Sequence, residues 1–109
     1  MKIENTKAQM RKGVLEFCIL SILQKGDAYT SEILKTLKGA EMIVVEGTIY
    51  PLLTRLKNAG LLSYRWEESQ NGPPRKYYSL TETGTETYKK LLDAWNDLSK
   101  SVNNLTATI

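Results

Sequence analysis

Residues 46–62, with the sequence EGTIYPLLTRLKNAGLL, decide the fold of this chain. Their apolar side chains recur every three or four residues, the spacing of one α-helical face, at Ile49, Leu52, Leu53, Leu56 and Ala59. The other side of this helix carries hydroxyl groups, an aromatic ring and Arg55, and residues 47–66 contain three basic residues and no acidic one. Such a helix either turns a solvated face outward or lies in the major groove of DNA, and the rest of the chain must decide between the two.

The composition is typical of one small globular protein. Of the 109 residues, 41% are hydrophobic and 25% are charged, and the longest apolar run is too short to cross a membrane. The amino terminus has no apolar segment of the kind that directs secretion, so we expect a cytoplasmic protein with no membrane partner. The net charge is +3, and residues 1–60 hold nine basic against six acidic residues. This mild bias favours a local, geometrical contact with any nucleic acid.

The sequence gives no sign of catalysis. It has no histidine, and no Ser, Lys or carboxylate pair stands at a catalytic spacing. We therefore expect no enzyme, no cofactor and no metal site. The single cysteine, Cys18, lies among apolar residues and is predicted to be a buried structural side chain rather than a redox sensor.

Two helices are predicted before residues 46–62. The first covers residues 5–24, and its second half is apolar on nearly every side, which places it at the centre of a core. The second begins near Thr30 or Ser31, whose hydroxyl groups can accept hydrogen bonds from the first turn, and it ends at Gly39. The third helix opens at residues 47–48 and has Pro51 in its first turn, where a missing N–H costs little.

After residue 60 the spacing of the apolar residues changes from that of a helix to that of a strand. Leu62, Tyr64 and Trp66 alternate with polar residues, and so do Tyr78 and Leu80, which predicts two half-buried strands. The residues between them, EESQNGPPR, contain a cluster of turn formers that no helix crosses. The expected structure is a β-hairpin with a long tip that carries basic residues.

The last predicted helix covers residues 81–109 and has a heptad seam. Its apolar residues are spaced alternately by three and four, with Leu92 beside the seam, at Tyr88, Leu91, Trp95, Leu98, Val102, Leu105 and Ile109. One alternative is a helix that packs on its own domain. The seam is longer than a small domain needs, which favours pairing with a second copy through Tyr88, Leu91, Leu92, Trp95, Leu98, Val102 and Leu105.

These elements together predict a mainly α protein with a small β-hairpin. Three helices followed by a hairpin form a winged helix-turn-helix, in residues 1–80, and a long carboxy-terminal dimerisation helix follows in residues 81–109. In this arrangement the third helix enters the major groove and the hairpin reaches the neighbouring sugar and phosphate. The alternative is a winged helix that assembles with proteins and has no role on DNA.

Two motifs in the chain resemble those of a known family. The run GTIYPLLTRLKNAGLL and the later run YRWEESQNGPPRKYYSLTETG are similar to the recognition helix and wing of PadR-family bacterial transcriptional regulators. The single carboxy-terminal helix resembles the short, drug-sensing branch of that family. The resemblance implies a homodimeric repressor that binds palindromic double-stranded operator DNA.

The resemblance also implies which residues contact DNA. Arg55 is expected to contact a base, and Arg75 and Lys76 the backbone. The start of the second helix favours phosphate independently, through its positive end. The full set of expected DNA-binding residues is Tyr29, Thr30, Ser31, Thr48, Tyr50, Pro51, Thr54, Arg55, Arg75, Lys76 and Tyr77.

Trp95 has two interpretations. At a seam position it can fill a dimer interface, where tryptophan is a frequent anchor. In drug-sensing family members that this chain resembles, two such tryptophans enclose a planar aromatic effector, which indole faces suit through stacking and cation–π attraction. Met10 and Phe17 on the first helix would then line the effector pocket, or their size would close it.

Overall fold

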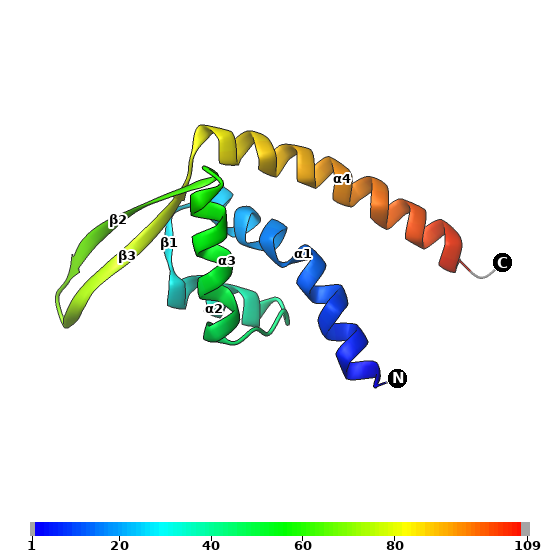
Figure 1. Ribbon diagram of the computed structural model, residues 1–109, viewed down its shortest axis with the longest axis horizontal. Helices are drawn as coiled ribbons and strands as arrows, with labels where there is room; N and C mark the ends of the chain where they lie inside the picture. The colour runs from blue at the N-terminus through cyan, green and yellow to red at the C-terminus, as the bar shows by residue number, and fades with distance from the viewer. Residues whose placement is uncertain (1, 108–109) are drawn as a thin grey trace.

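The computed structural model describes residues 2–107. It contains a mainly helical winged-helix fold with a small antiparallel sheet, as the sequence predicts (Figure 1). The elements in chain order are α1 (Ile3–Lys25), β1 (Ala28–Tyr29), α2 (Thr30–Gly39), α3 (Glu46–Asn58), β2 (Leu62–Ser69), β3 (Gly72–Leu80) and α4 (Glu82–Thr106).

The core lies between α1, α2, α3 and the base of the sheet. The apolar stripes predicted for the three helices meet there, and each buried Leu or Ile contributes about 1.5–3 kcal/mol to folding. On α3, Leu52 is only half-buried and Ala59 is exposed, because the helix ends at Asn58. The buried apolar residues are Leu15, Ile19, Leu20, Leu23, Ala28, Ile33, Leu37, Ile49, Leu53, Leu56, Leu62 and Tyr78.

The single cysteine lies at the edge of this core. Cys18 was predicted to be a buried structural side chain; it is half-buried and packs against the buried cluster. Its partial burial raises the pKa of the thiol, because a thiolate is poorly solvated there. The thiol is therefore protonated at neutral pH, which suits a structural side chain.

The sheet has three strands in the order β1-β3-β2, and the sequence analysis missed the shortest of them. β1 has two residues and pairs with Tyr77 and Tyr78 of β3. The β2–β3 hairpin, called the wing below, has longer strands than expected. Its tip is residues 70–71 only, so the predicted long tip was wrong. Pro73 and Pro74 lie within β3, beyond the part that pairs with β1 and beside the irregularity of the β2–β3 ladder between Glu67 and Ser69, where a missing N–H is tolerated.

The wing extends beyond the core that supports its base. Leu62 and Tyr78 are buried at this base, whereas Tyr64 and Trp66 are exposed, to 42% and 62%. The prediction that these two aromatic residues are half-buried was therefore wrong. Figure 1 shows the outer part of the wing standing clear of all helices.

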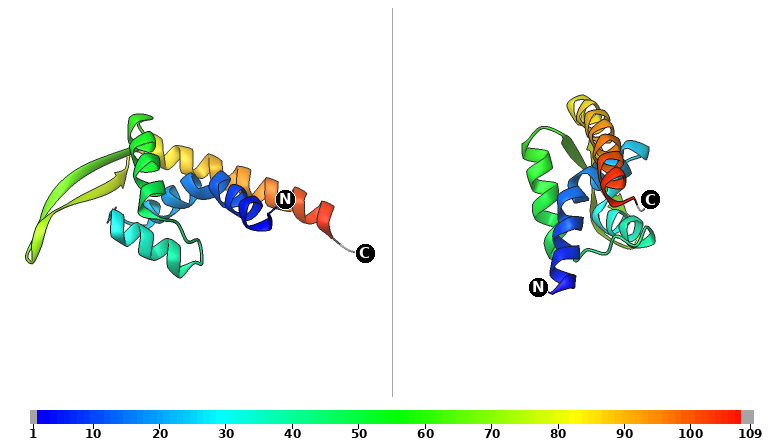
Figure 2. Two further views of the ribbon diagram at one scale, coloured as in Figure 1. Left: turned by 60° about the horizontal axis from the view of Figure 1, so that its bottom comes forward. Right: turned by 90° about the vertical axis from the view of Figure 1, so that its right-hand side faces the viewer.

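The long helix α4 starts immediately at the end of the wing. The Thr81 hydroxyl accepts a hydrogen bond from the Gly84 N–H (3.0 Å) and donates one to the Gly60 carbonyl oxygen (2.7 Å). The first part of α4 packs on α1, where the rings of Phe17 and Tyr88 stack at 5.9 Å. Beyond this contact, α4 and the first half of α1 diverge, and both lie at the end of the molecule opposite the wing tip (Figures 1 and 2).

The predicted heptad seam is an exposed apolar stripe of α4 from Leu91 onward, whereas its first residue, Tyr88, packs on α1 of the same chain. In the part of the chain described, α1 borders this stripe only at Leu91, Trp95 and Leu98, and Ile109 lies outside the described residues. The stripe consists of Leu91, Leu92, Trp95, Leu98, Val102 and Leu105. In residues 2–107 no helix is both long and apolar enough to span a bilayer.

Candidate nucleic-acid interface

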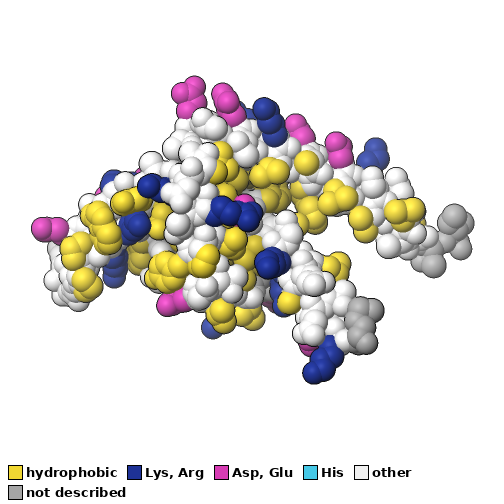
Figure 3. Space-filling model, viewed as in Figure 1, with side chains coloured by type: hydrophobic (Ala, Val, Ile, Leu, Met, Phe, Trp, Pro, Cys, Tyr) yellow, Lys and Arg dark blue, Asp and Glu magenta, His cyan; other side chains and the backbone are white. Residues whose placement is uncertain are grey.

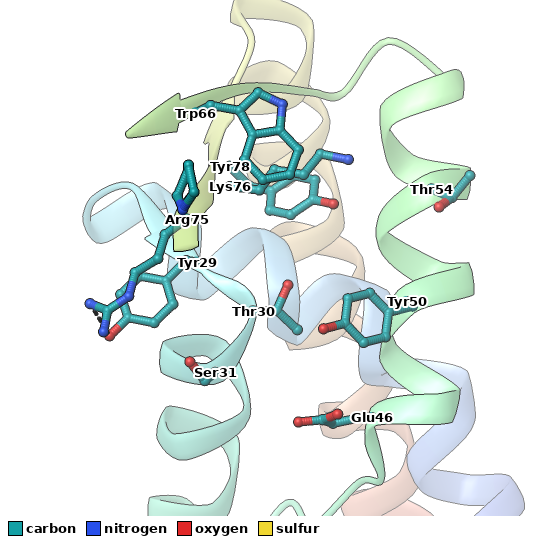
Figure 4. Close-up of a pocket in the computed structure, with 11 residues that line it drawn as sticks. Tyr29, Thr30, Ser31, Glu46, Tyr50, Thr54, Trp66, Arg75, Lys76 and Tyr78 are labelled. Atoms are coloured by element: carbon teal, nitrogen blue, oxygen red, sulfur yellow. Dashed lines mark hydrogen bonds between the residues drawn. The ribbon is translucent and has the colours of Figure 1, made fainter. Parts of the chain in front are cut away.

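A groove of about 430 Å³ lies between the start of α2, the exposed side of α3 and the wing, and is called the wing groove here (Figure 4). The three elements meet because β1 pairs with β3 directly before α2 begins. Seven of the predicted DNA-binding residues line the groove, together with four that were not predicted. The lining residues are Tyr29, Thr30, Ser31, Glu46, Tyr50, Thr54, Trp66, Pro74, Arg75, Lys76 and Tyr78.

The guanidinium group of Arg75 lies beside the start of α2. Its Nη1 atom donates a hydrogen bond to the Tyr29 hydroxyl oxygen (3.1 Å), and its guanidinium carbon lies 4.5 Å from the centre of the Tyr29 ring. Tyr29 is the N-cap residue of α2, so the free N–H groups of that helix and the guanidinium face the same space. A positive helix end beside a guanidinium is a good site for an anion such as phosphate.

The capping of α2 differs from the prediction. Neither Thr30 nor Ser31 is the cap; instead the Glu32 carboxylate accepts a hydrogen bond from the Tyr29 backbone N–H (3.2 Å). The hydroxyl groups of Thr30 and Ser31 line the wing groove. They remain available there to a ligand.

Lys76 lies on the other face of β3, towards α3. Its Nζ atom is 3.9 Å from the centre of the Tyr64 ring and within 6 Å of the rings of Trp66 and Tyr78. Successive residues of a strand point in opposite directions, so Arg75 and Lys76 leave β3 in different directions, and both line the wing groove (Figure 4). The exposed aromatic residues of the wing thus hold a basic side chain in place through cation–π contacts.

Tyr77 does not line the groove but supports it. Its ring packs edge-on against Tyr29, with 5.2 Å between ring centres, and Arg65 lies over its other side at 5.2 Å. Arg65 Nη1 also donates to Asp27 Oδ2 at 2.5 Å, and Arg65 Nε to Glu67 Oε1 at 3.0 Å. The hydrogen bond to Asp27, and then that to Glu67, raises the pKa of Arg65 above its ordinary value, so this residue is always charged.

The sequence does not reveal these supporting contacts, because the residues that make them come from distant segments. Asp27 precedes β1 and Arg65 lies on β2, 38 residues later. A short stretch of sequence gives no signal for such a pair. These contacts link the residue before β1 to β2 and β3 and lie next to Tyr29, the residue that Arg75 contacts.

Arg55 and Thr48 lie on the flank of α3 that faces α1, away from the wing groove. Arg55 forms an ion pair with Glu16 of α1, and Thr48 lines a separate hollow beside that helix. Pro51 is exposed on α3 between the two flanks. The expected base contact of Arg55 remains a prediction. To make that contact, the guanidinium would have to break its ion pair with Glu16 or bind Glu16 and the base together.

Glu46 is the acidic residue of the wing groove, and it was not predicted. It lies one turn before Tyr50 and two before Thr54, so all three are on one face of α3 (Figure 4). A carboxylate accepts hydrogen bonds and repels phosphate. At this place it therefore favours a base-edge donor, such as the amino group of cytosine, over the DNA backbone.

A smaller hollow, of about 140 Å³, lies between α1 and α4. It is lined by Gly13, Val14, Phe17, Leu91, Ala94, Trp95 and Leu98. Phe17 and Trp95 are thus together, as expected of a pocket between these helices. Met10 is 71% exposed and does not line the hollow, because it lies a turn further along the protruding half of α1.

Comparison with known proteins identifies the family. Residues 19–90 match the profile of the transcriptional regulator PadR-like family. The chain is 56% identical to a PadR-like transcription factor from Bacteroides fragilis, covering 94% of this chain and 99% of that one, with a TM-score of 0.77. It is 40% identical to a PadR-like transcriptional regulator from Bacillus cereus, covering 93% and 99% of the two chains, with a TM-score of 0.82.

One further match was solved with DNA. Bacillus subtilis PadR in complex with operator DNA is 28% identical, with a TM-score of 0.67 over 72% of this chain and 45% of that one. The winged-helix fold, the basic wing groove and these matches agree on a DNA-binding regulator rather than an enzyme. The chain belongs to the PadR-like family of transcriptional regulators.

Proposed function

We propose that this protein is a cytoplasmic, homodimeric repressor that binds a palindromic operator through α3 and the wing. The wing groove carries the proposal, because it gathers the positive end of α2, the outer face of α3 and two basic residues of β3 on one open surface. The similarity to PadR of Bacillus subtilis, which was solved in complex with operator DNA, supports a DNA-binding role for this chain.

Dimerisation through α4 follows from its exposed stripe. A stripe of leucine, valine and tryptophan on a protruding helix is unfavourable in water, and pairing with a second copy removes it from solvent. Residues 1–80 then act as the DNA-binding unit and residues 81–109 as the dimerisation helix. A twofold dimer presents two wing grooves in opposite orientations, which a palindromic site requires.

A planar aromatic effector is the proposed ligand of the hollow between α1 and α4. Small-molecule pockets measure about 300–1,000 Å³, so the 140 Å³ of one protomer is too small by itself. A second copy facing it across the α4 seam would about double the space and supply a second Trp95. Two indole faces at such a site favour flat and cationic compounds.

Replacing both wing cations, Arg75→Ala with Lys76→Ala, is expected to weaken DNA binding at least about tenfold at moderate salt. Each lost phosphate contact makes the plot of log affinity against log salt shallower by about one unit. Fluorescence anisotropy with a duplex selected from random DNA measures both quantities.

Lys89→Ala with Lys90→Ala is the matched control for this wing variant. It removes the same charge from exposed positions of α4, away from the wing groove, and is expected to bind DNA like the wild type. Equal affinity of the wing variant and this control would remove the wing from DNA binding. A wild-type protein that binds no duplex would instead favour the protein-interaction alternative.

Titration with a planar cationic dye is expected to quench the emission of Trp95. Trp66→Phe is the background for this measurement, since Trp66 is the other indole of the chain. The same background with Trp95→Phe is the control and should bind the dye more weakly, as followed by dye anisotropy. If a panel of such dyes leaves Trp95 emission unchanged, this residue fills the interface and the effector proposal fails.

A further inference from the structure

Helix α1 carries a basic face beside the first turn of α3. Ala8, Arg11, Lys12 and Leu15 follow one another at spacings of three, one and three residues, which places them on one side of the helix. They line a hollow of about 360 Å³ with Thr48 of α3 and with the connection before α3, residues 43–45. This α1 hollow is separate from the wing groove and from the hollow at Trp95.

The two cations of the α1 hollow have no acidic partner. In residues 2–107, neither Arg11 nor Lys12 has a carboxylate within ion-pair distance, whereas Lys7 is paired with Glu4 and Arg55 with Glu16. No acidic residue lines this hollow. The site is therefore positive, and Lys12 is exposed to solvent.

The α1 hollow and the wing groove lie on opposite flanks of α3. Thr48 and the ion pair of Arg55 face α1, whereas Glu46, Tyr50 and Thr54 face the wing. A helix in the major groove of B-DNA, which is about 12 Å wide, is bordered by a phosphate backbone on each side. The wing groove accounts for one of these two backbones only.

We propose that Arg11 and Lys12 bind the phosphate backbone on the second side of the major groove, so that α1 and the wing hold α3 between two backbone contacts. This proposal rests on the proposed function. Figure 3 supports it, because dark blue side chains lie over the wing, α3 and α1 on one face, whereas the acidic side chains gather mainly along the outer edge of α4. The DNA phosphate backbone matches the two unpaired cations and the one hydroxyl group of the α1 hollow, whose other lining residues are apolar.

The test is the double variant Arg11→Ala with Lys12→Ala. It should bind a mixed-sequence duplex of about three helical turns and a selected operator more weakly by the same factor, at least about fivefold, because phosphate contacts carry no sequence information. The salt dependence should also become shallower by about one unit per lost contact. Alanine favours helix, so circular dichroism and the melting temperature should stay close to the wild type.

Two comparisons make this result specific. Lys89→Ala with Lys90→Ala is again the control for lost charge, and Arg11→Lys should retain binding because it keeps the cation. The α1 contact would be overturned if the Arg11 and Lys12 variant bound DNA as tightly as the Lys89 and Lys90 control while the wing variant bound it more weakly. The proposed function would then remain intact. A change of oligomeric state in sedimentation would also overturn it, because the hollow would then belong to a contact between copies.

Failure of the proposed function gives a different result. In that case the wild type, the wing variant and the α1 variant would all show no binding to either duplex. The wild type is therefore measured first.

Discussion

Replacing Leu98 by Asp is expected to produce monomers and to reduce operator affinity by about two to four orders of magnitude. This is the factor by which binding through two linked sites exceeds binding through one. Leu98 lies at the centre of the exposed stripe of α4 and is 56% exposed in one chain. A carboxylate there is solvated in the monomer but would be buried without a partner in a dimer. Analytical ultracentrifugation and anisotropy measure the two effects.

The control for this variant is Asn104→Asp. It adds the same charge to the same helix, on the side turned away from the stripe. It should remain dimeric and bind DNA like the wild type. A Leu98→Asp protein that still sediments as a dimer would place the interface outside the α4 stripe. Because Leu98 contributes nothing to the buried core, circular dichroism should show both variants folded.

Replacing Gly84 by Ala is expected to cost about 2–4 kcal/mol of folding free energy, at the upper end of the values for overpacked sites. A Cβ atom at this position would lie 2.0 Å from the carbonyl oxygen of Leu61. That oxygen belongs to the backbone and also accepts a hydrogen bond from the Thr81 N–H (3.0 Å), so it has little freedom to move. The melting temperature should fall by about 10 °C or more for a chain of this size.

Gly39→Ala is the matched control for Gly84→Ala. Gly39 is the last residue of α2, and a Cβ atom there would meet nothing within 4 Å. This change should leave the melting temperature unchanged or slightly raised, because alanine costs less conformational entropy than glycine in a helix. If Gly84→Ala melts together with the wild type, the close approach of α4 to the connection before β2 does not hold in solution.

The helical part of the fold was predictable because its signals are periodic. The apolar stripe of α3 and the seam of α4 each recur over several turns, so an error at one residue leaves the pattern intact. β1 was missed because two residues are too few to show any period. The wing tip was predicted too long because Pro73 and Pro74 exclude a helix but not the outer part of a two-stranded ribbon.

The candidate site was predictable in its parts but not in its assembly. The motif positions placed Tyr50, Thr54, Arg75 and Lys76 on the correct elements, and the fold brings them to one groove. The division of α3 into two flanks was not visible, because the ion pair of Arg55 joins it to a residue 39 positions away. Periodicity describes one helix at a time, and which neighbour covers each flank is decided by tertiary packing.

The single residue between β3 and α4 has a mechanical consequence. Thr81 alone separates the two elements, and its hydrogen bonds to Gly60 and Gly84 tie both to the end of α3. The wing and α4 are therefore joined without a flexible linker, in a molecule 57 Å long. In the proposed dimer, a tilt of α4 relative to its partner would therefore change the separation of the two wings, and Thr81 is the residue at which that change would be transmitted.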